Sequence, residues 1–493
     1  APTRGSGSEH SLFPEATRLS QRLIAACCTS KIGSAGRLTP GHDSVRAIEG
    51  ERLDYMAGYW GVYLTSECLP GAVPPDQHTP YAAPYLLYPE CITADSFVAP
   101  RAESRKAWLY KIHPTVGSHS PFLPYSVPHL AGDASSWTEL TPEPIRWSGW
   151  ELPTEPTDFV HGLHTLAGTG SAESRTGMAI HVYTCNQDMG DSCFTNTDGD
   201  LLIVLELGEL EIMTECGLIQ AAPTEVVVIP RGFKFSVNLR QTAARGWICE
   251  VFGGHYRLPE RGPIGTAGLA DERHFRAPTA RYEDREVEFV SLHKFGGKLF
   301  RATYAYSPWD AVGWYGNIYP VKYDLKKFNA YGSTTFDHPD PSIHTVLTVP
   351  GDDHGHSAVD FVAFIGRWDA TEHTFKPPYC HRNFATEFNA IVAMDNAYQG
   401  FDQGVAFLTP FMSGHGVAAS SYNGFMAAPE SKTQRPVRLS DESIWIMFES
   451  TYQLRLTPWA VQATCRDQSY PRHNFWNGYK RNFDIHNPSG TKA

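Results

Sequence analysis

Three residues in the last quarter of the sequence have the types and spacing of a metal site. His381 and Glu387 delimit the segment His-Arg-Asn-Phe-Ala-Thr-Glu, and His415 ends the later segment Pro-Phe-Met-Ser-Gly-His. Two imidazoles and one carboxylate leave open coordination positions, a donor set that suits non-haem Fe(II) and reaction with O2. Zn2+ accepts the same donors, but it cannot change its oxidation state. Each histidine taken alone is more simply an ordinary core or surface residue, so the prediction rests on the three together.

Short β-strands are expected to position these side chains. Alternating or apolar segments occur in the first half at 178–185, 201–207, 209–215, 225–232, 233–237 and 247–252, and in the second half at 342–349, 359–365, 388–393, 405–408, 444–448 and 452–456. The 42 glycines and 36 prolines favour many turns and few long helices. Short strands at this spacing are typical of jelly-roll barrels. We therefore predict a mainly β fold of two tandem barrels, in which residues two apart project into the same interior.

The ligand pattern resembles the two short signatures of cupin barrels, which are His-x-His followed by Glu, and Pro-x-Gly-x-x-His. Asn383 stands at the second His place of the first signature, and His415 supplies the last imidazole. In the first half, the segment from Pro230 to Phe235 has the frame of the second signature, with Phe235 in the ligand place. We therefore predict a metal-free first barrel and a metal site in the second barrel.

The predicted organisation has three parts: an N-terminal extension (1–54), a metal-free cupin-like domain (55–290) and an iron-binding cupin domain (291–493) whose tail packs as a wrap. Hydrophobic residues make up 42% of the 493, enough for a sizeable core, and the net charge of −12 argues against nucleic-acid binding. No run of 18 apolar residues occurs, so no membrane span is expected. The ten cysteines form no Cys-x-x-Cys pair and the N-terminus lacks a signal-peptide pattern, which favours reduced thiols and a cytoplasmic location.

Five segments make the sequence similar to the homogentisate 1,2-dioxygenase family: 161–166, 198–204, 262–270, 336–343 and 377–383. The resemblance extends from about Tyr55 to Gln468. It implies a bicupin fold, Fe(II) in the second barrel, O2 as co-substrate, a small aromatic substrate and a homo-oligomer. The resemblance also implies that the iron ligands are His381, Glu387 and His415, and that the active-site base is His338. His338 could also be an additional metal ligand. Imidazole suits the removal of a phenolic proton near neutral pH.

Two departures from the family pattern bear on the substrate. Asn396 stands where the family has a tyrosine that hydrogen-bonds the substrate, and Thr409 stands where it has a further histidine. Both changes enlarge the pocket and alter its donors, and Tyr379 is a further pocket candidate. We therefore predict a larger polyphenol, of the anthraquinone or hydroquinone type that fungal polyketide-pathway relatives cleave in secondary metabolism. The alternatives are authentic homogentisate cleavage in tyrosine catabolism and a non-catalytic bicupin that binds or stores a ligand.

Two further residues near these segments leave several interpretations open. His344 stands where the family has an apolar ring, and it could be an additional metal ligand, a substrate contact or a buried histidine bonded to backbone. Lys376 takes the place of a family arginine. A lysine can lose its proton when buried, so Lys376 could form a carbamate that binds the metal, or it could be an exposed lysine.

Overall fold

The computed structural model describes residues 45–48, 50–117, 119–133, 135–332, 334–351, 356–395, 401–429, 435–470 and 475–488. Val45–Ile48 and Arg52–Ala493 form one compact unit, and the architecture below is that of its described residues. Most of the predicted N-terminal extension (1–54) lies outside the described residues.

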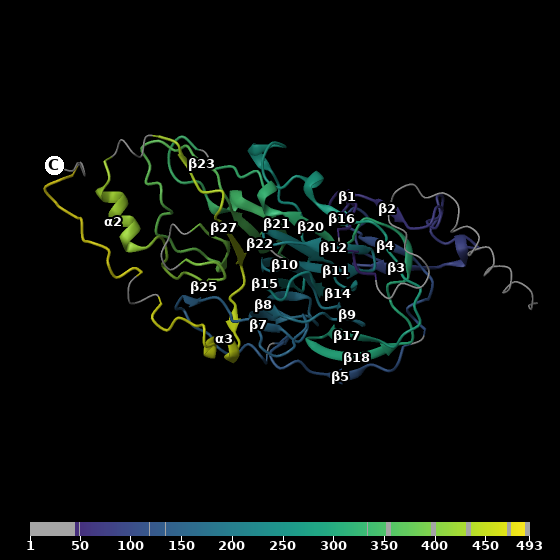
Figure 1. The fold of residues 1–493 in the computed structure, drawn as a ribbon. Helices are drawn as coiled ribbons and strands as arrows, with labels where there is room; N and C mark the ends of the chain where they lie inside the picture. The colour runs from purple at the N-terminus through teal and green to yellow at the C-terminus, as the bar shows by residue number, and fades with distance from the viewer. Residues whose placement is uncertain are drawn as a thin grey trace, which may run out of the picture. The chain divides into compact units, whose positions relative to one another are not determined.

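Three sheets are built from the first two thirds of the chain, drawn in purple to green, apart from the edge strand β28, which comes from the yellow end of the colour range (Figure 1). The nine-stranded sheet has the order β1 (Tyr55–Ala57), β16 (Arg276–Pro278), β20 (Val321–Asp324), β13 (Glu225–Ile229), β10 (Asp200–Leu207), β15 (Ala244–Val251), β8 (Thr176–Cys185), β7 (Leu163–Ser171) and β28 (Arg455–Leu456). The seven-stranded sheet has the order β12 (Gly217–Ala221), β11 (Leu210–Thr214), β14 (Lys234–Leu239), β9 (Ser192–Asn196), β17 (Phe289–Phe295), β18 (Lys298–Tyr304) and β5 (Leu123–Tyr125). A smaller sheet has the order β2 (Leu64–Glu67), β19 (Ala311–Gly316), β4 (Lys106–Lys111) and β3 (Tyr88–Thr93).

Strands from the second half of the chain form a two-stranded sheet and, together with β6 from the first half, a six-stranded sheet. The six-stranded sheet has the order β21 (Thr345–Pro350), β22 (Ser357–Phe364), β27 (Ile444–Ser450), β24 (Thr386–Ala393), β25 (Ala406–Thr409) and β6 (Ile145–Trp147). The short sheet pairs β23 (Trp368–Asp369) with β26 (Val437–Arg438). Among the described strands, only β9 and β17 pair in parallel. The fold is therefore mainly β, as predicted, with its strands divided between two barrels.

Helices are few and short in the part of the chain that the structure describes. The α-helices are α2 (Ala419–Ala427) and α3 (Pro458–Gln462), and the 3-10 turns are η1 (Pro84–Leu86), η2 (Gly262–Ile264), η3 (Glu272–His274), η4 (Leu325–Lys327) and η5 (Pro341–His344). The strand predicted from residue 342 begins only at Thr345, because Pro341 opens η5 with its fixed backbone angle. None of the described helices has the length and hydropathy to cross a bilayer.

The sheets do not divide the chain after residue 290, where the sequence pattern placed the domain boundary. β17, β18 and β20 all lie beyond or across that point, yet they pair with strands of the first barrel. In the opposite direction, β6 from the first half pairs with β25, and β28 from the second half pairs with β7. Pairing between strands distant in sequence decides these edges, and local patterns contain no signal for it.

One continuous hydrophobic core joins the two barrels. It contains Ile203 from β10 together with Phe388 and Phe448 from the six-stranded sheet. Trp147 is fully buried against Phe388, and its indole N–H donates a 2.9 Å hydrogen bond to the carbonyl of Ala460 in α3. Burial of an aromatic side chain of this size stabilises the fold by about 3–5 kcal/mol relative to alanine.

Candidate metal centre

The two faces of the six-stranded sheet differ in character: one carries aromatic side chains of the core, and the other carries Glu387. Phe361, Phe448 and Phe388 lie directly across from one another on β22, β27 and β24, and all three belong to the core. Side chains alternate between faces along a strand, so the residues one position earlier or later point to the other side. The aromatic row therefore sets the register that turns Glu387 away from the core.

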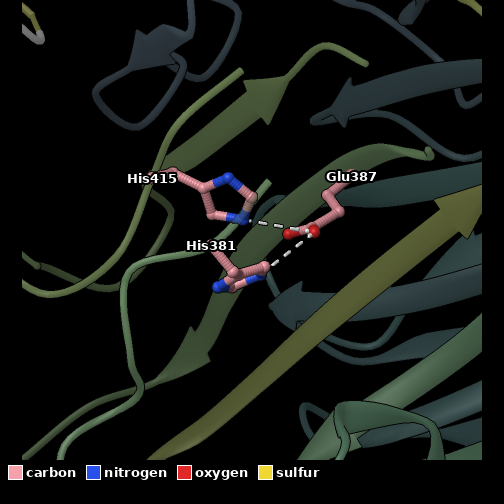
Figure 2. Close-up of side chains that lie close together, drawn as sticks. All are labelled: His381, Glu387 and His415. Atoms are coloured by element: carbon pink, nitrogen blue, oxygen red, sulfur yellow. Dashed lines mark ion pairs between the residues drawn. The ribbon is translucent and has the colours of Figure 1, made fainter. Parts of the chain in front are cut away.

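Three side chains meet on that second face. Glu387 is the second residue of β24, and His381 and His415 pair through an isolated bridge beside the β24–β25 hairpin. The bridge has hydrogen bonds of 2.9 and 3.0 Å between the two backbones. Figure 2 shows both imidazoles turned toward the Glu387 carboxylate. The Oε1 atom of Glu387 lies 3.2 Å from Nε2 of His415 and 3.8 Å from Nε2 of His381.

The backbone fixes which nitrogen of each imidazole faces the carboxylate. Nδ1 of His381 donates to the carbonyl of Tyr379 at 3.0 Å, and Nδ1 of His415 donates to the carbonyl of Ser413 at 2.9 Å. With Nδ1 protonated, Nε2 of the neutral ring has a free lone pair. This second hydrogen bond is what orients metal-binding histidines in general. Nε2 of His415 is buried and has no hydrogen-bond partner among the described residues.

The negative charge of Glu387 favours the binding of a cation. Burial alone would raise the pKa of Glu387, but the two imidazoles and the Asn383 amide outweigh it and hold the pKa far below its ordinary value. The carboxylate of Glu387 raises the pKa of His381. Without a metal, the site therefore concentrates negative charge on Glu387, which attracts protons to the neighbouring imidazole.

The donor set fits a divalent transition metal. One ligand atom from each of His381, Glu387 and His415 lies within 4.8 Å of the others. Two donors bound to one ion at about 2.1 Å lie at most about 4.2 Å apart, so small side-chain rotations are sufficient. Two imidazoles and a carboxylate on one side of an ion leave the remaining positions open. No other such group of histidine, cysteine and acidic side chains occurs among the described residues.

Asn383 stands at the place of the second histidine in the cupin signature, but its side chain is hydrogen-bonded to the Glu387 carboxylate. Its amide nitrogen donates to Oε1 of Glu387 at 2.7 Å and approaches Oε1 of Glu449 at 3.4 Å. Glu449 on β27 lies directly opposite Glu387, and Asp360 on β22 lies directly opposite Glu449. Sequence patterns did not single out either acid, although each is a lone charge in an otherwise apolar strand.

His338 and Tyr379 lie next to the ligands in a chain of rings. The His338 ring centroid is 5.9 Å from that of Tyr379, which is 5.5 Å from that of His381. Nδ1 of His338 donates to the carbonyl of Pro339, so Nε2 is the nitrogen that can accept a proton. The preceding Asp337 has a φ of +67°, a left-handed conformation that commonly marks functional loops. The base role of His338 stays a prediction.

His344 is buried outside the three-residue group. It ends η5, packs edge-on against Phe364, and its Nδ1 has no hydrogen-bond partner in the described part of the chain. Burial, and then the charge of Arg367, lowers the pKa of His344 to about 3, so the ring is neutral. His344 does not belong to the group of three residues whose ligand atoms lie within 4.8 Å of one another. Its role as an additional ligand or as a substrate contact stays a prediction.

Lys376 is neither exposed nor placed as a ligand. Its ammonium group contacts the Asp369 carboxylate at 3.1 Å, the Thr371 carbonyl at 2.6 Å and the Thr371 hydroxyl at 3.1 Å. A lysine side chain has donors and no acceptor, so three oxygen acceptors around Nζ match an unmodified lysine. The carbamate interpretation of Lys376 stays a prediction. Lys376 thus ties together the loop that follows β23.

The structure describes one of the two positions at which the sequence departs from the family pattern. Thr409, the last residue of β25, is buried and lies directly opposite Glu387. Its side chain is therefore on the ligand face. Asn396 lies outside the described residues.

A mainly β fold of cupin type in which two histidines and a glutamate could hold one ion is the pattern of a non-haem metal protein. Residues 54–325 match the family model described as Homogentisate 1,2-dioxygenase N-terminal, and residues 326–483 match the one described as Homogentisate 1,2-dioxygenase C-terminal. The chain belongs to the homogentisate 1,2-dioxygenase family, a family of non-haem iron dioxygenases that cleave aromatic rings.

Three solved structures have low similarity to this chain, and they give no information about its activity. A cupin 2 conserved barrel domain protein from Leptotrichia buccalis is 7% identical, with a TM-score of 0.25, over 61% of this chain and 91% of that one. The pirin YhhW from Escherichia coli, in complex with nickel(II), is 9% identical, with a TM-score of 0.23, over 65% of this chain and 97% of that one. AerE from Microcystis aeruginosa is 9% identical, with a TM-score of 0.25, over 63% and 98%.

Proposed function

We propose that the chain is an Fe(II)-dependent dioxygenase that inserts both atoms of O2 into the ring of a polyphenol larger than homogentisate. The observation that carries the proposal is the meeting of His381, Glu387 and His415 on one face of a barrel sheet, with their donor atoms within 4.8 Å. Fe(II) held there would supply the electron transfer that lets O2 react with an aromatic ring.

The protein's own residues would prepare the substrate for that reaction. His338 is the proposed base, because its Nε2 is left free when Nδ1 donates to Pro339. Removal of a phenolic proton makes an anionic oxygen, which a cation beside Glu387 attracts. Tyr379, between the His338 and His381 rings, is the proposed pocket wall against which the substrate ring packs.

The small side chain of Thr409 supports a substrate larger than homogentisate. This residue lies opposite the ligand Glu387, where the family resemblance leads one to expect an imidazole. A threonine there leaves more room beside the metal and removes a ring nitrogen that could bind a substrate group. A polar pocket discriminates strongly against a substrate that does not match its donors. We therefore propose an anthraquinone-type or hydroquinone-type polyphenol as the substrate.

The test compares two substrates on one preparation. The protein is loaded with Fe(II) without air, and O2 uptake is followed with homogentisate and with a hydroxylated anthraquinone. Uptake with the anthraquinone and little with homogentisate supports the proposal, whereas robust turnover of homogentisate overturns the preference for a larger ring. Failure to bind iron favours a non-catalytic binding protein. The small-molecule substrate, the homo-oligomer and the cytoplasmic location stay predictions. The eight described cysteines form no disulfide.

A further inference from the structure

The C-terminal strap, residues 475–479, is bound to the loop that follows His415. The backbone carbonyl of Phe475 accepts a 2.7 Å hydrogen bond from the N–H of Ala419, at the start of α2. The residue before that helix is Ala418, which has no side-chain oxygen to cap the free N–H groups. A carbonyl from the strap thus takes the role that a local serine or aspartate usually has.

Further strap contacts reach closer to the ligand. The indole N–H of Trp476 donates to the carbonyl of Gly416 at 3.2 Å, and the side chain of Asn423 in α2 donates to the carbonyl of Gly478 at 2.7 Å. Gly416 is the residue directly after His415. The strap therefore contacts the backbone immediately beside one proposed ligand.

One strap residue contacts both ligand loops. The hydroxyl of Tyr479 donates to the carbonyl of Val417 at 2.7 Å, two residues after His415. The same oxygen lies 3.3 Å from Sγ of Cys380, the residue directly before His381. Because the hydroxyl proton is used on Val417, the Cys380 thiol is the donor in the second contact. Burial raises the pKa of Tyr479, so its hydroxyl keeps the proton that it donates.

The two loops touch at the same point. A Cβ atom on Gly416 would lie only 2.9 Å from Cα of Cys380, so this close approach requires glycine. The bridge between His381 and His415 lies directly beside this contact. A shift of either loop would therefore move one imidazole relative to the other.

We propose that Tyr479 is a positioning residue for the metal ligands: its hydroxyl joins the loops of His381 and His415 and holds their imidazoles at the separation that a bound ion requires. This inference rests on the proposed metal site. It assigns to the C-terminal strap a function in metal affinity, which is distinct from a function in folding.

The experiment titrates metal-free protein with Co(II), without air, and follows the visible absorption of the bound ion. Wild type is compared with Tyr479→Phe, which removes only the hydroxyl, and with Tyr422→Phe as the matched control. Tyr422 packs against the Tyr479 ring with centroids 5.1 Å apart, and its hydroxyl has no hydrogen bond among the described contacts. We expect the Kd for Co(II) to rise about tenfold in Tyr479→Phe, the size typical of lost support around a ligand, with a changed absorption band. Tyr422→Phe should bind as wild type does.

Each outcome separates positioning from simple stabilisation. All titrations are run well below the unfolding midpoints of the metal-free variants. A lower midpoint for Tyr479→Phe with an unchanged Kd would mean that the strap only stabilises the fold, and the inference would be wrong. If Tyr479→Phe does not fold, Cys380→Ala, at an exposed position, should weaken Co(II) binding in the same direction, and an unchanged Kd there overturns the inference. Absence of Co(II) binding by wild type would instead overturn the metal site itself.

Discussion

Glu449 on β27 lies directly opposite Glu387 on β24, so two carboxyl groups share one face of the sheet beside the proposed metal. Asp360 extends the row on β22. Burial, followed by the charges of Glu387 and Asp360, raises the pKa of Glu449 to about 7. The metal-free site therefore takes up a proton near neutral pH that a bound cation would displace.

The first prediction concerns the pH dependence of stability. The pKa of Glu449 rises from 4.5 to about 7 on folding, so its favourable contribution is complete below pH 4.5 and is lost as the pH rises through 7. When the pH rises from 5 to 8, the free energy of unfolding of metal-free Glu449→Gln should therefore increase by about 1–3 kcal/mol relative to that of wild type. Urea unfolding at the two pH values measures the difference. Parallel changes in the two proteins would contradict the pKa assignment.

The second prediction separates ligands from the base. His381→Ala and Glu387→Ala should lose iron and turnover together, because each removes a donor atom. His338→Ala should keep its iron and lose rate by about 10²–10⁴-fold, the usual contribution of a general base. Iron analysis after anaerobic loading, run beside O2 uptake, distinguishes them. Equal iron content in all three variants is the result that would refute the assignment.

The third prediction tests the support of Glu387. Asn383→Ala removes the 2.7 Å hydrogen bond to the carboxylate, and we expect iron binding to weaken about 10–100-fold. Asn186→Ala is the control, because Asn186 also makes two side-chain hydrogen bonds, to Thr157 and Pro153, but in the first barrel. The control should lower the free energy of unfolding without changing the affinity for iron. An equal affinity in both variants would show that Asn383 does not orient the ligand.

The fourth prediction concerns Lys376. Lys376→Met leaves the Asp369 and Thr371 oxygens without their ammonium partner and should cost about 1.5–3 kcal/mol of stability. Iron affinity should be the same with and without added bicarbonate, because Nζ of Lys376 is already hydrogen-bonded to Asp369 and Thr371. Urea unfolding and iron titration measure these two quantities. Tighter binding in bicarbonate would instead place a carbamate at Lys376.

Local pattern was sufficient to predict much of the fold and the central group. Each of the twelve predicted segments overlaps a strand of the structure, because hydrophobic periodicity is a property of neighbouring residues. Other strands, such as β17 and β18, had no predicted counterpart. His381 and Glu387 were predicted from their similarity to the first cupin signature, and His415 from its similarity to the second.

Tertiary structure alone decided which distant groups lie beside that centre. The row of Asp360, Glu449 and Glu387 exists because Phe361, Phe448 and Phe388 fix the register of three strands against the core. Tyr479 contacts the ligand loops although it lies far from both in sequence. Strand register and tail docking depend on non-local packing, whose free energy is shared among many residues, so no short stretch of sequence contains the signal.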